Sequence, residues 1–560
     1  MDMRKYKFMR AGLAAGTSAV LVLGGGAVAS ANTKAGVAAV REISAASNGG
    51  SVTVDTSSPP NSLDPQEGYT TSAGEADWIV YTPLLTYAHQ NGLAGTVIIP
   101  GLATSLPVIT GGGQIYTLTL RKGLEYSNGA PVVASDFKFA VERALRLNWG
   151  ASSFLQPIVG AAAYQAGKAS TLTGITTDDA TGKIVIHLTS SIGDFSNVLC
   201  FPATSPVPQD TPMKVQTINL PPGVGAYIIK DVVPNVSYEL VKNPLFASFK
   251  IPGIPVGHLA EITTDIVSNV TTETESVLNN QVDAMDVTDT VPPELLGRVA
   301  SQAASRFQKE IVASTNYFFM NEALPPFNNQ LAREAAAYSV DRNALARLAG
   351  GFVTPTCYFI PVGIAGHPTA PCPYPSPNIV KAKALLAQAH LVGAKVSVFG
   401  FSGAPQSTEA QYYASALQQA GFAVTLKLIN PAIYWSTIGN VQTHADTGEA
   451  GQFLDFPNPA DFLMLIDARN IHPVNSDNFG NINDPHIQAT LERLEAVPAA
   501  NLMSVASQWA ALDEYATQHV DYIVWGSNEL IKFFSDRIDF KTAVFQPLFF
   551  NDYSTWQLNS

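Results

Sequence analysis

Cysteine and basic residues are both scarce in this sequence. Three cysteines among 560 residues are too few for a scaffold held together by disulfides. Lysine and arginine total 32 against 45 aspartates and glutamates, which gives a formal net charge of −13. Proteins that bind nucleic acids present clusters of lysine and arginine to the phosphates, so we expect no nucleic acid partner.

The usual signatures of catalysis and of metal binding are also missing. The chain contains no GxSxG motif, and its glycine triplet at 111–113 lacks the GK[ST] ending of a phosphate-binding loop, so we expect a hairpin turn there. His367 with Cys372, and His472 with His486, lack the i,i+4 or CxxC spacing of metal ligands. We therefore expect no catalytic residue, no metal site and no cofactor.

The first 31 residues are typical of an export signal. Residues 1–10 hold four basic residues, 11–28 are uncharged and rich in Ala, Gly, Leu and Val, and 29–31 read Ala-Ser-Ala. This order predicts a signal peptide cleaved after Ala31, with a retained membrane anchor as the alternative. No cysteine lies near the cleavage point, so a lipid anchor is not indicated. Residues 32–50 read as an Ala/Gly/Ser linker, and the chain without 1–31 carries a net charge of −16.

The remaining chain, roughly 530 residues, is too long for one hydrophobic core and predicts at least two domains. Cys357 and Cys372 flank a proline-rich loop and could form one local disulfide, which would leave Cys200 as a buried thiol. Spacing alone cannot establish that pairing.

Two regions give clear secondary-structure patterns. The stretch 114–145 predicts a strand, an Asn-Gly turn and a helix that Ser135 caps and whose apolar face carries Phe137, Val141, Ala144 and Leu145. In 330–351, Asp341 can cap a helix that two glycines end.

Downstream of these helices the pattern becomes an alternation of helices and strands. Ser376 and Pro377 predict a further helix start, and 394–429 reads as strand, helix, strand. This succession predicts an α/β lobe with a mixed sheet. We expect its aromatic residues to lie mainly in the core, with one lining a cleft as the alternative; they are Tyr412, Tyr413, Tyr434 and Trp435.

The stretch QFLDFPNPADF at 452–462 places a carboxylate among apolar and aromatic residues. Prolines 457 and 459 exclude a helix there, so Asp455 should lie where a strand enters a stiff loop. A carboxylate in such surroundings needs a cationic partner, which suggests a charged ligand. The alternative is an exposed loop aspartate that caps a helix starting near Ala460.

Several motifs, in this order along the chain, resemble the family 5 solute-binding proteins of ABC importers, which bind dipeptides, oligopeptides or nickel. They are SLDP, YTPLL, GLATS, YTLTLRKGLEYSNGAPVVASDFKFAVERAL, GVGAYII with LVKNPLF, EITTDIVSNVTTETESVLNNQVDAMDV and YFFMNEALPPFNNQLAREAAAYSVDRNALARLAGG. One departure is GAY where the family usually has Gly-Pro-Tyr. The resemblance runs from about Val52 to Phe540.

This resemblance implies an α/β, two-lobed fold like that of periplasmic binding proteins (type II, cluster C), with an extra subdomain inserted into lobe one. We expect lobe one at 51–310 with the insertion at 78–200, lobe two at 311–524, and a C-terminal return to lobe one at 525–560.

The resemblance also implies a function and a site. In the family's peptide binders, the aspartate at the position of Asp455 pairs with the ligand's α-ammonium, and main-chain groups near Gly451, Gln452 and Phe453 receive the ligand backbone. Gln452 stands where the family commonly has tryptophan, which leaves the preferred peptide open. We therefore expect a monomeric, extracytoplasmic protein that delivers a short peptide to membrane permease subunits. The alternatives are a different solute, such as a sugar, an opine or a metal chelate, and a secreted hydrolase.

Overall fold

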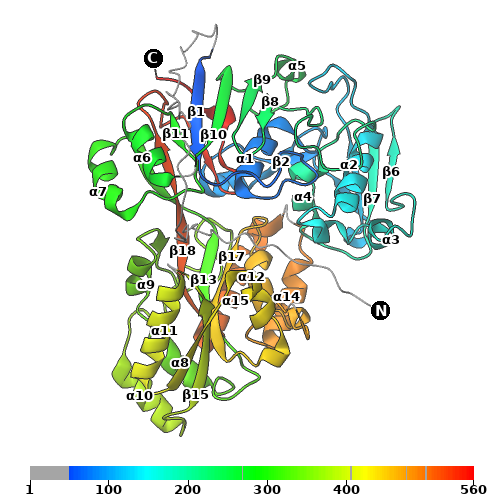
Figure 1. Cartoon of the computed structure of the whole chain (residues 1–560). Coiled ribbons are helices and arrows are strands. Elements are labelled where there is room, and N and C mark those ends of the chain that lie inside the picture. The colour runs from blue at the N-terminus through cyan, green and yellow to red at the C-terminus, as the bar shows by residue number, and fades with distance from the viewer. Residues whose placement is uncertain (1–48, 268, 404–405, 475, 499–500, 560) are drawn as a thin grey trace, which may run out of the picture.

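The chain folds into two α/β lobes, one above the other in Figure 1. The computed structural model describes residues 49–559, except 268, 404–405, 475 and 499–500. The predicted signal at 1–31 lies outside the described residues. The predicted two-lobed α/β architecture is confirmed, and a single sheet, strand order β16-β15-β17-β13-β18-β11-β1-β10-β9-β8, runs through both lobes.

Lobe one is built on the upper half of this sheet. Its strands are β1 (Ser51–Thr56), β8 (Tyr227–Val233), β9 (Ser237–Lys242), β10 (Glu261–Ile266), β11 (Ala284–Met285) and β12 (Phe307–Ile311), and its helices are α1 (Thr71–Val80), α5 (Phe246–Phe249), α6 (Val270–Leu278) and α7 (Pro293–Gln302). Alternating residues of β1, such as Val52 and Val54, are fully buried in the largest hydrophobic core. Helices α6 and α7 cover the opposite face of the sheet through a separate cluster.

A smaller unit, with its own four-stranded sheet β4-β5-β7-β6, lies beside lobe one. Its elements are β2 (Leu85–Tyr87), β3 (Ile98–Pro100), β4 (Val108–Thr110), β5 (Ile115–Thr119), α2 (Ala134–Leu147), α3 (Ala161–Gln165), β6 (Ile175–Asp178), β7 (Lys183–His187) and α4 (Phe195–Val198). The glycine triplet at 111–113 joins the antiparallel strands β4 and β5, as predicted. Phe137 of α2 and Ile184 of β7 belong to the same core as β1, so this unit packs on lobe one as one body.

Lobe two has helices on both faces of the lower half of the sheet. Its strands are β13 (Ser314–Met320), β14 (Val353–Thr354), β15 (Lys395–Phe401), β16 (Ala423–Ile429) and β17 (Thr447–Phe453). Helices α8 (Gln330–Ala337), α9 (Arg342–Leu348), α10 (Ile379–Gln388) and α11 (Gln406–Ala420) pack on one face, and α12 (Pro431–Ile438), α13 (Ala460–Leu463), α14 (Pro485–Glu495) and α15 (Leu502–His519) on the other. Strands β15 and β16 are parallel and β13 and β17 antiparallel, which confirms the predicted mixed sheet.

Strand β18 (Tyr522–Phe534) passes from one lobe into the other (Figure 1). Its first half pairs with β13 of lobe two and its second half with β12 and β11 of lobe one. The chain crosses a second time at Val312 and Ala313, between β12 and β13. A hollow of about 470 Å³, lined by both lobes, lies beside this crossing, so the two lobes are not packed solidly there. After β18, the chain adds β19 (Phe545–Gln546) and β20 (Phe550–Asn551) to lobe one.

Two predicted helix starts are wrong. Helix α2 begins at Ala134, and the carboxylate of Asp136, rather than Ser135, accepts the Val133 N–H at 3.0 Å. Ser135 instead donates its hydroxyl to Asp179 at 2.7 Å. Helix α10 begins at Ile379, where Asn378, rather than Ser376, accepts the Lys381 N–H at 2.9 Å. In both places several polar residues compete for the same backbone donors, and tertiary contacts decide among them.

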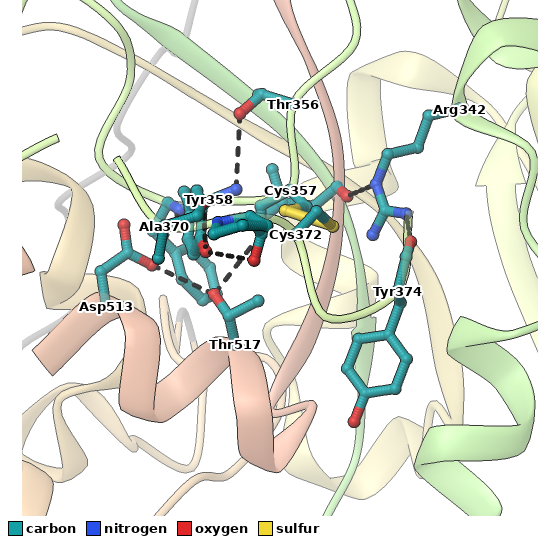
Figure 2. The surroundings of a disulfide bond; sticks show 12 residues. Arg342, Thr356, Cys357, Tyr358, Ala370, Cys372, Tyr374, Asp513 and Thr517 are labelled. Carbon is teal, nitrogen blue, oxygen red and sulfur yellow. Dashed lines mark hydrogen bonds between the residues drawn. A yellow bond between two sulfur atoms is a disulfide. The ribbon is translucent and has the colours of Figure 1, made fainter. Parts of the chain in front are cut away.

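The proline-rich loop is closed by the disulfide that the sequence left open. Cys357 and Cys372 are bonded, with their Cα atoms 6.1 Å apart, and Cys200 is a buried free thiol. Figure 2 shows how the loop is fastened around this bond: the Tyr358 hydroxyl donates to the Ala370 carbonyl at 3.0 Å, and the Thr517 hydroxyl of α15 donates to the Cys357 carbonyl at 3.5 Å. The loop is thereby held against lobe two.

Candidate functional site

Strand β17 has an open edge where it approaches lobe one. On one side it pairs with β13 along its whole length. On the other side β15 pairs only with Thr447 and Gly448, and no strand of the described residues pairs with 449–453 there. Where β15 and β17 separate, the Tyr434 hydroxyl donates a hydrogen bond to the Glu449 carbonyl at 2.7 Å. Among the described residues, the rest of this edge of β17 therefore has no strand partner.

The ladder with β13 decides which backbone groups face that edge. Leu454 donates its N–H to the Ala313 carbonyl at 3.0 Å, and the Asp446 carbonyl accepts the Asn321 N–H at 2.8 Å. Because backbone groups alternate in direction along an antiparallel strand, the even-numbered residues between these two ends point toward β13. The N–H and C=O groups of Gly451 and Phe453 consequently point toward the open edge.

The side chains at this edge differ in exposure. Phe453 is 39% exposed, whereas Gln452 is only 4% exposed. The Gln452 side chain lies under the loop that follows, with its Nε2 atom 3.5 Å from Asp461 Oδ1. Gly451 and Phe453 thus present backbone groups at the open edge, whereas the side chain of Gln452 is buried under the following loop.

Asp455 lies just beyond the end of β17, as predicted, and is half-buried. Its backbone N–H donates to Asp461 Oδ2 at 2.8 Å, and the Tyr69 hydroxyl donates to its Oδ1 atom at 2.8 Å. The alternative role as a helix cap is wrong, because Asn458 Oδ1 accepts the Ala460 N–H at 3.0 Å. The carboxylate of Asp455 therefore faces lobe one.

The two lobes touch around this carboxylate. Besides Tyr69 and Asp455, the rings of Phe154 and Phe456 meet edge to face with centroids 5.8 Å apart. Asn458 also donates a side-chain hydrogen bond to Asp194. These contacts all join lobe one or its inserted unit to the loop after β17, so the two lobes meet beside Asp455.

A further contact between the lobes involves Gly193. It donates its N–H to the Glu495 carbonyl at 3.3 Å, and a Cβ atom added to it would lie 2.2 Å from the Val497 carbonyl. Only glycine permits this approach of the two backbones.

Sequence reasoning missed the lobe-one half of this site. Tyr69 lies 386 residues from Asp455 along the chain, and no motif connects the two positions. Phe154 and Asp194 were equally invisible, since neither belongs to a charged cluster or a recognisable motif. Tyr434, one of the four aromatic residues expected mainly in the core, is fully buried and carries the hydroxyl that donates to the Glu449 carbonyl.

Asp194 is a half-buried carboxyl group in the contact between the lobes. Burial, and then the nearby charge of Glu495 in lobe two, raise its pKa to about 7. Burial also raises the pKa of Glu495, although Arg469 hydrogen-bonds to that carboxylate and opposes the shift. Two carboxyl groups thus lie close together across the contact, and ionising both there is unfavourable.

The variant Asp194→Asn should make stability less dependent on pH. The folded protein holds the Asp194 proton up to about pH 7, whereas the ordinary pKa is 3.8. Between these two pKa values the folded state binds more protons than the unfolded state. The stabilisation that protonated Asp194 provides is therefore complete below its ordinary pKa and is lost as the pH rises through 7. Each unit of pKa difference between the folded and unfolded states is worth about 1.4 kcal/mol. The free energy of unfolding of wild type should therefore fall by roughly 2 to 4 kcal/mol as Asp194 ionises.

Calorimetric melting between about pH 5 and about pH 8 tests this expectation. Asp178→Asn is the matched control, since Asp178 lies exposed at the end of β6. Buried carboxyls elsewhere, such as Asp513 and Glu409, contribute equally to all three proteins. Equal pH slopes for wild type and Asp194→Asn would contradict the expected role of the buried contact.

The described residues around the site form no metal-binding cluster. Among residues 49–559, apart from the few not described, no group of three or more His, Cys, Asp and Glu side chains is arranged to hold a metal ion. Within the same residues, no helix is both long and apolar enough to cross a membrane. The site combines a strand edge, the carboxylate of Asp455 and nearby aromatic rings.

Comparisons with known proteins identify the family. Residues 97–470 match the model of the bacterial extracellular solute-binding proteins, family 5. The oligopeptide-binding protein OppA of Escherichia coli is 26% identical over 372 residues, which cover 63% of this chain and 66% of OppA. The glutathione-binding protein GsiB of Salmonella choleraesuis is 30% identical over 285 residues, half of each chain. The chain thus aligns with less than two thirds of either relative.

A solved structure, clavulanic acid biosynthesis oligopeptide binding protein 2, superposes with a TM-score of 0.81 at 21% identity, covering 92% of this chain and 96% of that one. This likeness confirms the fold of a two-lobed periplasmic binding protein with an inserted subdomain. Because the family model matches more than half of the sequence, the chain belongs to the family 5 bacterial extracellular solute-binding proteins.

Proposed function

We propose that this protein is the extracytoplasmic solute-binding component of an ABC importer, which captures a short peptide between its lobes and delivers it to membrane permease subunits. The observation that carries the proposal is the position of Asp455, at the end of an open strand edge and inside the contact between the lobes. The relatives named above as oligopeptide- and glutathione-binding proteins support the same ligand class. We propose a binding role without catalysis and a monomer as the working form.

The ligand binds in an extended conformation along β17. Its free α-ammonium pairs with the Asp455 carboxylate in a charge-assisted hydrogen bond. Its backbone adds to the edge of the sheet through the N–H and C=O groups of Gly451 and Phe453, a common mode of peptide recognition. Gln452 contributes indirectly, because its side chain contacts Asp461, which in turn holds the backbone of Asp455.

Closure of the lobes completes the site. We propose the domain limits expected from the sequence, with lobe one at 51–310, its insertion at 78–200, lobe two at 311–524 and the return at 525–560, moved by a few residues so that all of α1 and β12 stay in lobe one. The hinge then lies at the two chain crossings, at Val312 and Ala313 and within β18. Ligand binding shifts the population toward the closed form because only that form makes contacts from both lobes.

The same proposal includes export. The basic, apolar and small-residue order of 1–31 supports translocation with cleavage after Ala31. N-terminal sequencing of the exported protein should begin at Asn32, and mature material that still starts at Met1 would contradict cleavage.

A thermal-shift screen tests the ligand class. The panel holds di- to pentapeptides with free amino groups, together with sugars, opines and metal chelates. A ligand at a hundred times its dissociation constant stabilises the folded state by about 2.7 kcal/mol, which is visible as a higher melting temperature. We expect peptides to give the shift. A shift from another solute class and from no peptide would contradict the peptide assignment and leave the family assignment intact.

A further inference from the structure

Tyr69 is the lobe-one residue that reaches the proposed ammonium site. It lies in the loop between β1 and α1, and its hydroxyl donates to Asp455 Oδ1 at 2.8 Å across the contact between the lobes. The bond joins a neutral donor to a carboxylate, so it is of the stronger, charge-assisted kind.

The surrounding residues hold the Tyr69 ring in place. It packs edge to face against Trp149, with ring centroids 5.7 Å apart, and Trp149 Nε1 donates to the Gly68 carbonyl at 3.1 Å. A Cβ atom at Gly150 would lie 2.9 Å from Tyr69 Cδ1, so a larger residue there would displace the ring. On the other side, Asn61 Oδ1 accepts the Tyr69 N–H at 3.0 Å. The hydroxyl is thus aimed at lobe two by contacts made entirely within lobe one.

The carboxylate of Asp455 is held on the other side of the contact. Its backbone is fixed by Asp461, so the direction of its side chain depends on what its oxygens bind. An ionised carboxylate has about four acceptor positions, and it can therefore receive the Tyr69 hydroxyl and a ligand ammonium together. The Tyr69 bond restricts the rotation of the carboxylate and thereby the directions from which an ammonium can approach it.

We propose that Tyr69 is a positioning residue that orients Asp455 for the ligand's free ammonium and couples recognition of that ammonium to closure of the lobes. This inference rests on the proposed function, because it assigns Tyr69 a role toward the ligand class proposed above. Separation of the lobes at this contact would break the Tyr69 bond, so a form with the lobes apart should hold the carboxylate less firmly and bind the ammonium less tightly. Closure and ammonium binding then reinforce each other.

A double-mutant cycle tests the coupling. The four proteins are wild type, Tyr69→Phe, Asp455→Asn and the double variant, each titrated with one free-amine peptide taken from the screen. Tyr69→Phe should weaken binding about tenfold, as expected for loss of a hydrogen bond to a charged group, and mainly through faster dissociation. In the Asp455→Asn background the same change should weaken binding by no more than about twofold, because the carboxylate that Tyr69 orients is gone.

Tyr515→Phe is the matched control. Its hydroxyl donates to Asp484 Oδ2 at 3.1 Å, the pair is also partly buried, and both residues belong to lobe two. This variant should leave peptide affinity unchanged. Unchanged affinity in Tyr69→Phe, or an equal loss from Tyr69→Phe in both backgrounds, would overturn the proposal, since a purely structural role gives no coupling.

A second measurement needs no ligand and separates this inference from the peptide assignment. Small-angle scattering of the ligand-free protein should give a larger radius of gyration for Tyr69→Phe than for wild type or Tyr515→Phe, because the phenol contact favours the closed form. If no peptide in the screen binds wild type, the proposed function fails, and scattering alone decides the role of Tyr69 in closure. Equal radii for the three proteins would then overturn it.

Discussion

Asp455→Asn should weaken the binding of a free-amine peptide by roughly thirtyfold to several thousandfold, equivalent to about 2 to 5 kcal/mol. The asparagine keeps the shape of the side chain and removes its charge. In the closed form the ligand ammonium would lie among aromatic rings of both lobes, such as Phe154 and Phe456, without a carboxylate to pair with. A cation buried without a partner accounts for most of this loss.

Calorimetric titration measures this effect directly, and thermal melting checks the fold. The ligand-free melting temperature of Asp455→Asn should stay close to that of wild type, because a half-buried loop side chain adds little to the core. Asp178→Asn, at the exposed end of β6, serves as the control and should bind like wild type. A loss of less than about threefold in Asp455→Asn would contradict the assigned role of the carboxylate.

Arg143→Ala should lower the free energy of unfolding by about 3 to 5 kcal/mol. Arg143 of α2 makes a two-pronged ion pair with Asp64, with Nη1 and Nη2 at 2.5 and 2.6 Å from its carboxylate oxygens. Both side chains are fully buried. Removing the arginine leaves the Asp64 charge buried and without its cation, which is far more costly than loss of a surface pair.

Arg143→Ala should also weaken ligand binding. Asp64 belongs to the same loop as Tyr69, so the ion pair fixes the base of the segment that contacts Asp455. Peptide affinity should therefore fall along with stability in Arg143→Ala. Denaturant titration gives the free energy of unfolding, with Arg298→Ala as the control. Arg298 pairs with Glu275 at 2.9 Å on the surface, where loss should cost no more than about 1 kcal/mol. Equal losses in the two variants would contradict the importance of burial.

The parts of the fold that local sequence determines were predictable. Pro457 and Pro459 forbid a helix, and Asp455 does lie at a strand end. The alternation of strand and helix in 394–429 gave the parallel pair β15 and β16, and the short spacing of Cys357 and Cys372 allowed the observed disulfide. In each case, the residues that determine the local structure lie close together in the sequence.

The parts that depend on distant contacts were not predictable. Tyr69, Phe154 and Asp194 reach the site only through contacts between the two lobes. The helix starts at Ser135 and Ser376 were wrong for a related reason. Each has polar neighbours that can serve equally well as caps, and Ser135 is drawn to Asp179 on a neighbouring turn. Sequence reasoning therefore found one half of the candidate site and missed the half that lobe one supplies.

The recognition of a free ammonium is the central claim, and calorimetric titration of wild type with one peptide in two forms tests it most directly. The peptide is used first with a free amino terminus and then N-acetylated, which removes the charge and leaves the backbone and side chains unchanged. We expect the acetylated form to bind at least about thirtyfold more weakly, the loss expected of a missing charge pair at Asp455. Equal affinity for the two forms would contradict the assignment of Asp455 as the ammonium receptor.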